Sequence, residues 1–445
     1  MEIEKYGIDP VPKEMQVVGA KDLFSIFMNF LFNPATIIKG GLAVSAGLSF
    51  KVACICETSG AILAILFYIT MATVGVDYGI PGQVAARVAF GWRGAKVFCS
   101  FPRFVVSIYF FGLQTVVGSI AIKSVLDQIT GYSLNPIAIA VPFAILQAAI
   151  ALFGYDSLKW LSRIALPAKI LILGSLIFFM SSKGGVYSIG NVWQYPAAPG
   201  VGWALAAVWI NASAATWLSM STDAADFCRY SKNRVHMWLG ILVACLCGTS
   251  MASAFGAYGA CVTMGKQVNT FTVIVDSHPN FLVLVAVIFV IILDNWTINV
   301  LNIYTGGLSI NNITTKMTRF QSTLLASFCG VLLSSFPNFL NRYLGDINII
   351  GSVFSPIAGV LAFDYIFIRK FNINLSGLYE VSGPYNYQHG FNYIAVFCVF
   401  FGLFIYFFLV PDFFIRSFFS ALVTGGIYII LFKIFGMYEK NKHAA

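Results

Sequence analysis

Residues 30–41 read Phe-Leu-Phe-Asn-Pro-Ala-Thr-Ile-Ile-Lys-Gly-Gly, in the middle of an apolar run that spans 23–48. A run of about 20 apolar residues is long enough to cross a bilayer as a helix. Proline removes a backbone donor, and it pushes the residue before it out of helical geometry. Asn33-Pro34 therefore predicts a helix that is interrupted in mid-membrane.

A second interruption is predicted in the run 201–226, where the segment Asn211-Ala-Ser-Ala-Ala-Thr216-Trp217 is only weakly apolar. In the order of the apolar runs, these are the first and the sixth helices. Two interrupted helices five apart are typical of inverted-repeat transporters, which bind their ligand near the bilayer midplane. The alternative is that both helices are kinked for packing alone.

The composition also indicates a membrane protein. Of 445 residues, 58% are hydrophobic and 10% are charged, whereas a soluble domain has about 25% charged residues. This excludes a soluble enzyme, a nucleic-acid binder, a disordered chain and a disulfide scaffold. The net charge of +9 is typical of basic cytoplasmic loops. The nine cysteines mostly lie in apolar runs, where free cysteine packs as a small apolar residue.

Twelve apolar runs are expected to be transmembrane helices: 23–48, 50–75, 97–125, 134–154, 158–182, 201–226, 235–262, 281–307, 320–340, 346–368, 392–410 and 414–436. With the N-terminus in the cytoplasm, nineteen lysines and arginines fall in inside segments and six in outside segments. Cytoplasmic loops carry such an excess. We therefore expect a multi-pass protein of a plasma membrane or bacterial inner membrane, with both termini cytoplasmic.

The predicted organisation follows the order of these runs. It comprises a cytoplasmic N-terminal segment (1–22), helices 1–5 as a first repeat (23–182), helices 6–10 as an inverted repeat (201–370), a cytoplasmic loop (371–391), helices 11–12 (392–436) and a cytoplasmic tail (437–445).

Polar side chains inside the third and eighth helices are candidates for a binding site, because such side chains face a cavity or a partner. Phe110 and Gln114 are four residues apart and share a helix face. The amide suits the edge of a planar ring, and the aromatic side chain could stack on its face. The alternative is an interhelical hydrogen bond. In the eighth helix, Asn295, Asn299 and Asn302 form one stripe, flanked by Asp294 and Thr297.

These motifs resemble the nucleobase–cation symporter family, in its purine–cytosine permease branch. The resemblance covers nearly the whole chain, and the residues that carry it are Phe110-Phe111-Gly112-Leu113-Gln114; Asp226-Phe227-Cys228-Arg229-Tyr230; Asn299, Asn302, Tyr304, Leu308 and Ser309; Pro356 and Asp364-Tyr365; and Tyr385, Tyr387, Gly390 and Asn392.

The resemblance implies an all-α fold of twelve transmembrane helices: a five-plus-five inverted repeat with two discontinuous helices, and two peripheral helices. It implies that one planar ring binds between helices 1, 3, 6 and 8. Phe110 takes a stacking position usually held by Trp, Trp217 stacks on the opposite face, and Gln114 reads the ring edge. The remaining expected binding residues are Asn33, at the break in helix 1, and Asn299 and Asn302 on helix 8.

The coupling ion is predicted from a departure from the family pattern. Sodium-coupled members bind the ion with carbonyls of helix 1 and two adjacent hydroxyls of helix 8, and the corresponding pair here is Thr297-Ile298. Isoleucine cannot supply the oxygen that a hard cation needs. Lys169, about ten residues into helix 5, could replace the ion and exchange a proton near neutral pH. The alternative is a lysine that snorkels to the interface.

Four further charges lie within predicted helices. Lys39 and Glu57 are each nine residues from Leu48, and they could form an ion pair that fixes helix 1. Asp223 and Asp294 are both candidates to accept the transported proton or to bind an amino group of the ligand. The sequence does not distinguish between these two aspartates.

We expect a secondary active importer of a nucleobase, cytosine or a purine, or a similar planar heterocycle, with proton symport favoured over sodium. The alternatives are a permease for hydantoin, allantoin or a thiamine-precursor pyrimidine, or an amino-acid transporter of the same fold. The expected partners are this small ring and the lipid bilayer, with no nucleic acid, obligate protein partner, cofactor or metal. An enzyme is not expected, because motifs such as His-Glu-x-x-His are absent from the sequence.

Overall fold

The computed structural model describes residues 6–153, 155–336, 342–381 and 383–442. Over these ranges the fold is helical, and two isolated β-bridges are the only extended pairings. The main elements up to residue 181 are α1 (Ala20–Leu31), α2 (Pro34–Ser45), α3 (Phe50–Tyr78), α4 (Gly82–Ala85), α5 (Arg87–Phe90), α6 (Trp92–Ala95), η2 (Lys96–Ser100), α7 (Phe101–Thr130), α8 (Pro136–Ala151) and α9 (Tyr155–Ser181).

The elements after residue 181 continue the bundle. They are α10 (Ile189–Trp193), α11 (Trp203–Ser219), η4 (Met220–Thr222), α12 (Ala224–Cys228), α13 (Arg234–Val262), α14 (Thr270–Asp276), α15 (Phe281–Ile313), α16 (Arg319–Leu333), α17 (Tyr343–Phe363), η6 (Asp364–Ile368), α18 (Tyr393–Phe404), η8 (Ile405–Leu409) and α19 (Arg416–Lys442).

Seven helical spans in the described residues are long and apolar enough to cross a membrane, or eight if α1 and α2 together form one span. Three shorter apolar helices accompany them, at Pro136–Ala151, Arg319–Leu333 and Tyr393–Leu409. The structure is therefore that of a multi-span membrane protein. The full count of twelve spans and the inverted repeat stay predictions, and residues 337–341 of the expected run 320–340 lie outside the described part.

The break in the first helix is confirmed at the predicted position. The axes of α1 and α2 are bent by 48° across Phe32 and Asn33. Pro34 is the first residue of α2, a position where its missing N–H is not needed. The Asn33 side chain caps α2 by accepting a hydrogen bond from the backbone N–H of Thr36 at 3.0 Å.

The second break was predicted in the wrong place. The segment Asn211–Trp217 lies inside the continuous helix α11, because its alanines favour a helix. The regular helix ends instead at Ser219, and a 3₁₀ turn (η4) leads to Asp223 with φ −122° and ψ 5° before α12 begins. The interruption therefore follows the predicted segment.

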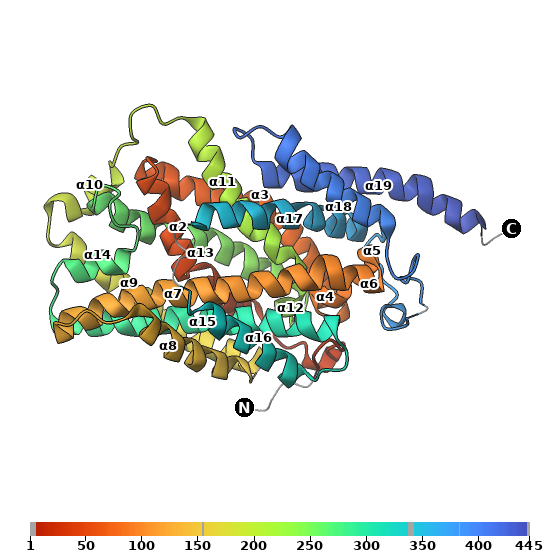
Figure 1. The fold of residues 1–445 in the computed structure, drawn as a ribbon, viewed down its shortest axis with the longest axis horizontal. Helices are drawn as coiled ribbons and strands as arrows, with labels where there is room; N and C mark the ends of the chain where they lie inside the picture. The colour runs from red at the N-terminus through yellow and green to blue at the C-terminus, as the bar shows by residue number, and fades with distance from the viewer. Residues whose placement is uncertain (1–5, 154, 337–341, 382, 443–445) are drawn as a thin grey trace.

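The broken pair α1–α2 and the helix α11 are linked through α3 and α13. α7 lies along α15, α3 lies along α11, and α13 packs against α1, α2 and α3. α18 and α19 pack on α17 and run along one edge of the bundle, seen in blue in Figure 1. The segment 371–391 contacts the short helix α6. The backbone N–H groups of Arg93 and Gly94 both donate hydrogen bonds to the Gly390 carbonyl.

Candidate functional site

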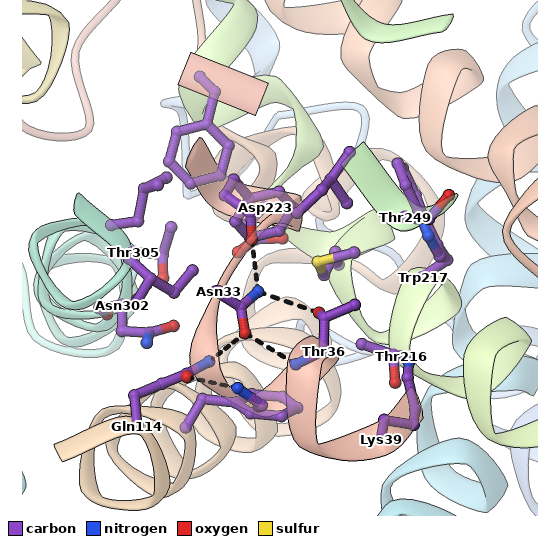
Figure 2. Close-up of a pocket in the computed structure, with 18 of the residues that line it drawn as sticks. Asn33, Thr36, Lys39, Gln114, Thr216, Trp217, Asp223, Thr249, Asn302 and Thr305 are labelled. Carbon is purple, nitrogen blue, oxygen red and sulfur yellow. Dashed lines mark hydrogen bonds between the residues drawn. The ribbon is translucent and has the colours of Figure 1, made fainter. Parts of the chain in front are cut away.

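A cavity lies beside the break between α1 and α2, and it is lined from α7, α11 and α15 as well (Figure 2). Its free volume is about 50 Å³, which is room for a few water molecules. Five of the six expected ring-binding residues line it: Asn33, Phe110, Gln114, Trp217 and Asn302. Asp223, expected as a coupling residue, also lines it.

The aromatic side chains enter the cavity from two different helices. Phe110 comes from α7 and is 8% exposed, and Trp217 comes from the end of α11 and is 1% exposed. The Trp217 ring packs edge-on against Tyr68, with 5.4 Å between the ring centroids. This contact fixes the indole orientation. Both aromatic side chains therefore form part of the cavity wall.

Gln114 connects α7 to the broken helix. Its side-chain oxygen accepts from the Ala35 N–H at 2.9 Å, and its side-chain nitrogen donates to the Asn33 side-chain oxygen at 2.9 Å. Figure 2 shows this group beside the cavity. A primary amide has two N–H donors and two acceptor lone pairs, so one donor and one acceptor position remain for a ligand.

The asparagines of α15 do not all face the cavity. Asn302 lines it, whereas the Asn299 side chain is directed at neighbouring helices. Asn299 donates to Thr115 Oγ1 at 3.0 Å and to the Gln147 side-chain oxygen, and its own oxygen accepts from Asn302. Asn299 therefore positions Asn302 and does not line the cavity itself.

Lys169 and Asp294 form a buried ion pair next to the break, with side chains 0% and 1% exposed. The Lys169 ammonium also donates to the backbone carbonyl of Phe32 at 2.6 Å. This carbonyl ends α1, where the helix dipole is negative. Lys169 thus connects α9 to α15 and to the broken helix. Neither Lys169 nor Asp294 lines the ring cavity.

The remaining predicted coupling residues lie elsewhere. Thr297 Oγ1 donates to the backbone carbonyl of Asp294 at 2.9 Å, so the α15 group that meets the lysine is the Asp294 carboxylate and not the Thr297 hydroxyl. Ile298 lines the ring cavity. Asp223 is paired with Arg103 of α7, with 3.3 Å between Asp223 Oδ2 and Arg103 Nη1.

Several cavity residues were not expected from the sequence. Thr36, Thr216, Thr249, Thr305 and Tyr343 all line it. Thr305 is three residues after Asn302, so an extension of the polar stripe would have found it. Thr36 and Thr216 lie within the two segments that were predicted to interrupt helices, whereas Thr249 and Tyr343 lie outside every motif considered in the sequence.

Several membrane-spanning helices, a broken first helix and a polar–aromatic cavity beside the break are together typical of membrane transporters. The chain belongs to the nucleobase–cation symporter family: residues 10–429 match the family of permeases for cytosine/purines, uracil, thiamine and allantoin. Its relatives are permeases and transporters, not enzymes. This chain is likewise a transporter and not an enzyme.

Two curated relatives and one solved structure illustrate the match. The chain is 24% identical to the hydantoin permease of Microbacterium maritypicum, over 85% of this chain and 79% of that protein. It is 26% identical to the cytosine permease of Escherichia coli (strain K12), over 81% of each. The structure of Mhp1, a nucleobase-cation-symport-1 family transporter in a closed conformation with bromovinylhydantoin bound, matches with a TM-score of 0.81 at 21% identity, covering 96% of both chains.

Proposed function

We propose that this protein imports a neutral planar heterocycle, a nucleobase such as cytosine or a purine, by alternating access. The observation that carries the proposal is the cavity itself. Phe110 and Trp217 offer aromatic faces, and Gln114 and Asn302 offer amide edges. Stacking favours any flat ring, and the amides complement a ring that has both donors and acceptors.

Binding of radiolabelled cytosine, adenine, hydantoin and leucine to the purified protein tests the proposal. We expect one of the three rings to bind and leucine not to bind. A protein that binds leucine, or none of the rings, would contradict it. Selective binding of hydantoin would favour the second candidate, a permease for hydantoin, allantoin or a thiamine-precursor pyrimidine. Such permeases occur among the relatives, whose names include hydantoin and allantoin permeases.

The contacts at the start of α2 argue against an amino-acid substrate. A carboxylate would bind to free N–H groups at a helix N-terminus. The N–H groups of Ala35, Thr36 and Ile37 already donate to the Gln114 side chain, the Asn33 side chain and the Asn33 carbonyl. A carboxylate would have to displace these contacts.

We propose further that transport is coupled to protons through Lys169. Its ammonium occupies a position between the Phe32 carbonyl and the Asp294 carboxylate, where it acts as a bound cation. When the pair separates during transport, the buried ammonium loses its partner, and burial disfavours the charged amine. The proton then leaves on the cytoplasmic side. The resulting loss of contact to Phe32 loosens the break of the first helix and releases the ring.

A further inference from the structure

A second buried ion pair lies in the wall of the ring cavity. Lys39 of α2 and Glu57 of α3 both line the cavity, and their charged atoms are 2.6 Å apart. The two side chains are 3% and 6% exposed. The sequence spacing predicted that these residues could meet. The structure confirms the pair and adds that it lines the same cavity as Thr216 and Trp217.

The third contact of this pair comes from α11. The Ser213 hydroxyl lies 3.1 Å from Glu57 Oε1 and 2.6 Å from the Glu57 backbone carbonyl. Glu57 is therefore held by Lys39 and by Ser213, and the Lys39 ammonium, which has three N–H donors, retains donors that can point to a ligand.

A structural role alone does not account for the pair. Two charges within a membrane protein are costly to desolvate, and a buried ion pair is often no more stable than well-packed apolar side chains of the same volume. α2 and α3 could be held together by such side chains. A pair in the wall of a binding cavity has a second use, because it presents a donor and an acceptor next to each other without a net charge.

We propose that Lys39 and Glu57 read an edge of the substrate ring and select rings without a net charge. Lys39 donates to a ring carbonyl and Glu57 accepts from the adjacent N–H, so that the ring has an amide-type edge at this wall. A charged ring is attracted by one member of the pair and repelled by the other, so it loses its hydration without gaining an unpaired counter-charge. The other charged side chains that line the cavity in the described residues, Arg103 and Asp223, are also paired.

This inference rests on the proposed function and defines the class of its substrate. Competition binding against the labelled ring that binds most tightly gives the test. The matched competitors are uracil and orotate, which is uracil with a carboxylate at carbon 6. The wild-type protein should prefer uracil. In Glu57→Gln the Lys39 charge is unpaired, so the ratio of uracil affinity to orotate affinity should fall by at least about tenfold, since like charges in contact cost several kcal/mol.

The matched control is the double variant Lys39→Gln/Glu57→Gln. It contains the same Glu57 substitution but has no net charge, so the preference for uracil should return. If Glu57→Gln fails to fold, Lys39→Gln decides the question. It leaves Glu57 unpaired, and it should raise the affinity for 4-aminopyridine, a cation at neutral pH, by at least about tenfold relative to uracil.

A purely structural pair predicts a different pattern: lower protein yield and thermal stability, with all competitors weakened by the same factor. Ratios that stay unchanged in the folded single variant, or that move in the opposite direction, would overturn the inference. A wild-type protein that binds no ring at all would instead refute the proposed function.

Discussion

The ammonium of Lys169 lies 2.6 Å from the backbone carbonyl of Phe32, at the point where the first helix is broken. Three residues later, the Ala35 N–H donates to Gln114 at the edge of the ring cavity. The two sides of one break are thus held by two different sites. A change in the Lys169–Phe32 contact can therefore alter the cavity through the break. In the same way, a bound ring that takes hydrogen bonds from Gln114 can alter the contacts of Lys169.

Replacing Lys169 should uncouple transport. Lys169→Ala removes the charge from the contact with Phe32 and Asp294, so uptake against a gradient should be lost, while downhill exchange of the ring continues because the cavity is separate. Lys169→Arg should also fail to accumulate, because a guanidinium does not lose its proton. Counterflow exchange and pH-driven uptake, measured in the same vesicles, separate the two activities. Normal accumulation by Lys169→Arg would exclude proton release from residue 169.

Gln114→Ala should abolish uptake and leave membrane insertion intact. The substitution removes the group that we propose to read the ring edge, and it also removes two contacts to Asn33 and Ala35. Gln194→Ala is the control, because Gln194 is exposed in the connection after α10 and does not line the cavity. Uptake assays with membrane yield as the reference are the measurement. Wild-type ring affinity in Gln114→Ala would contradict the assigned site.

Trp217→Ala should weaken ring binding by about 1–3 kcal/mol, as expected for the loss of one aromatic–base stack. Because this side chain is fully buried against Tyr68, the alanine variant also creates a cavity. Trp217→Phe keeps an aromatic face and should lose less affinity than Trp217→Ala. Equilibrium binding of the labelled ring to purified protein gives the values. Equal affinities for all three proteins would remove Trp217 from the site.

The orientation can be measured separately. The excess of basic residues predicts that both termini lie in the cytoplasm. A reporter fused after Ala445 should therefore report the cytoplasm, and a reporter inserted within 183–200 should report the outside. The reverse result would show that the bundle is inverted with respect to the membrane.

The sequence predicts those features that depend on local chemistry. Asn33-Pro34 predicts the break in the first helix, because proline and an N-capping side chain act within one turn. Phe110 and Gln114 were expected to share a helix face, and both line the cavity. The second break was misplaced because a polar but alanine-rich segment remains helical.

Contacts between helices that are distant in the sequence could not be predicted from the sequence. Asp223 and Asp294 are both buried aspartates, and only the packing of α7 and α9 assigns Arg103 to one and Lys169 to the other. The stripe on α15 was also ambiguous. Asn302 lines the cavity, whereas Asn299 contacts α7 and α8. The sequence shows that these side chains share one side of α15, but not which neighbour each of them contacts.

The coupling ion gives the most direct test of the account, in which a ring is carried inward together with a proton. Purified protein in proteoliposomes is supplied with the labelled ring under either an imposed proton gradient or an imposed sodium gradient. We expect accumulation with the proton gradient, without sodium, and none with the sodium gradient at equal pH on both sides. Accumulation driven by sodium alone would contradict the account.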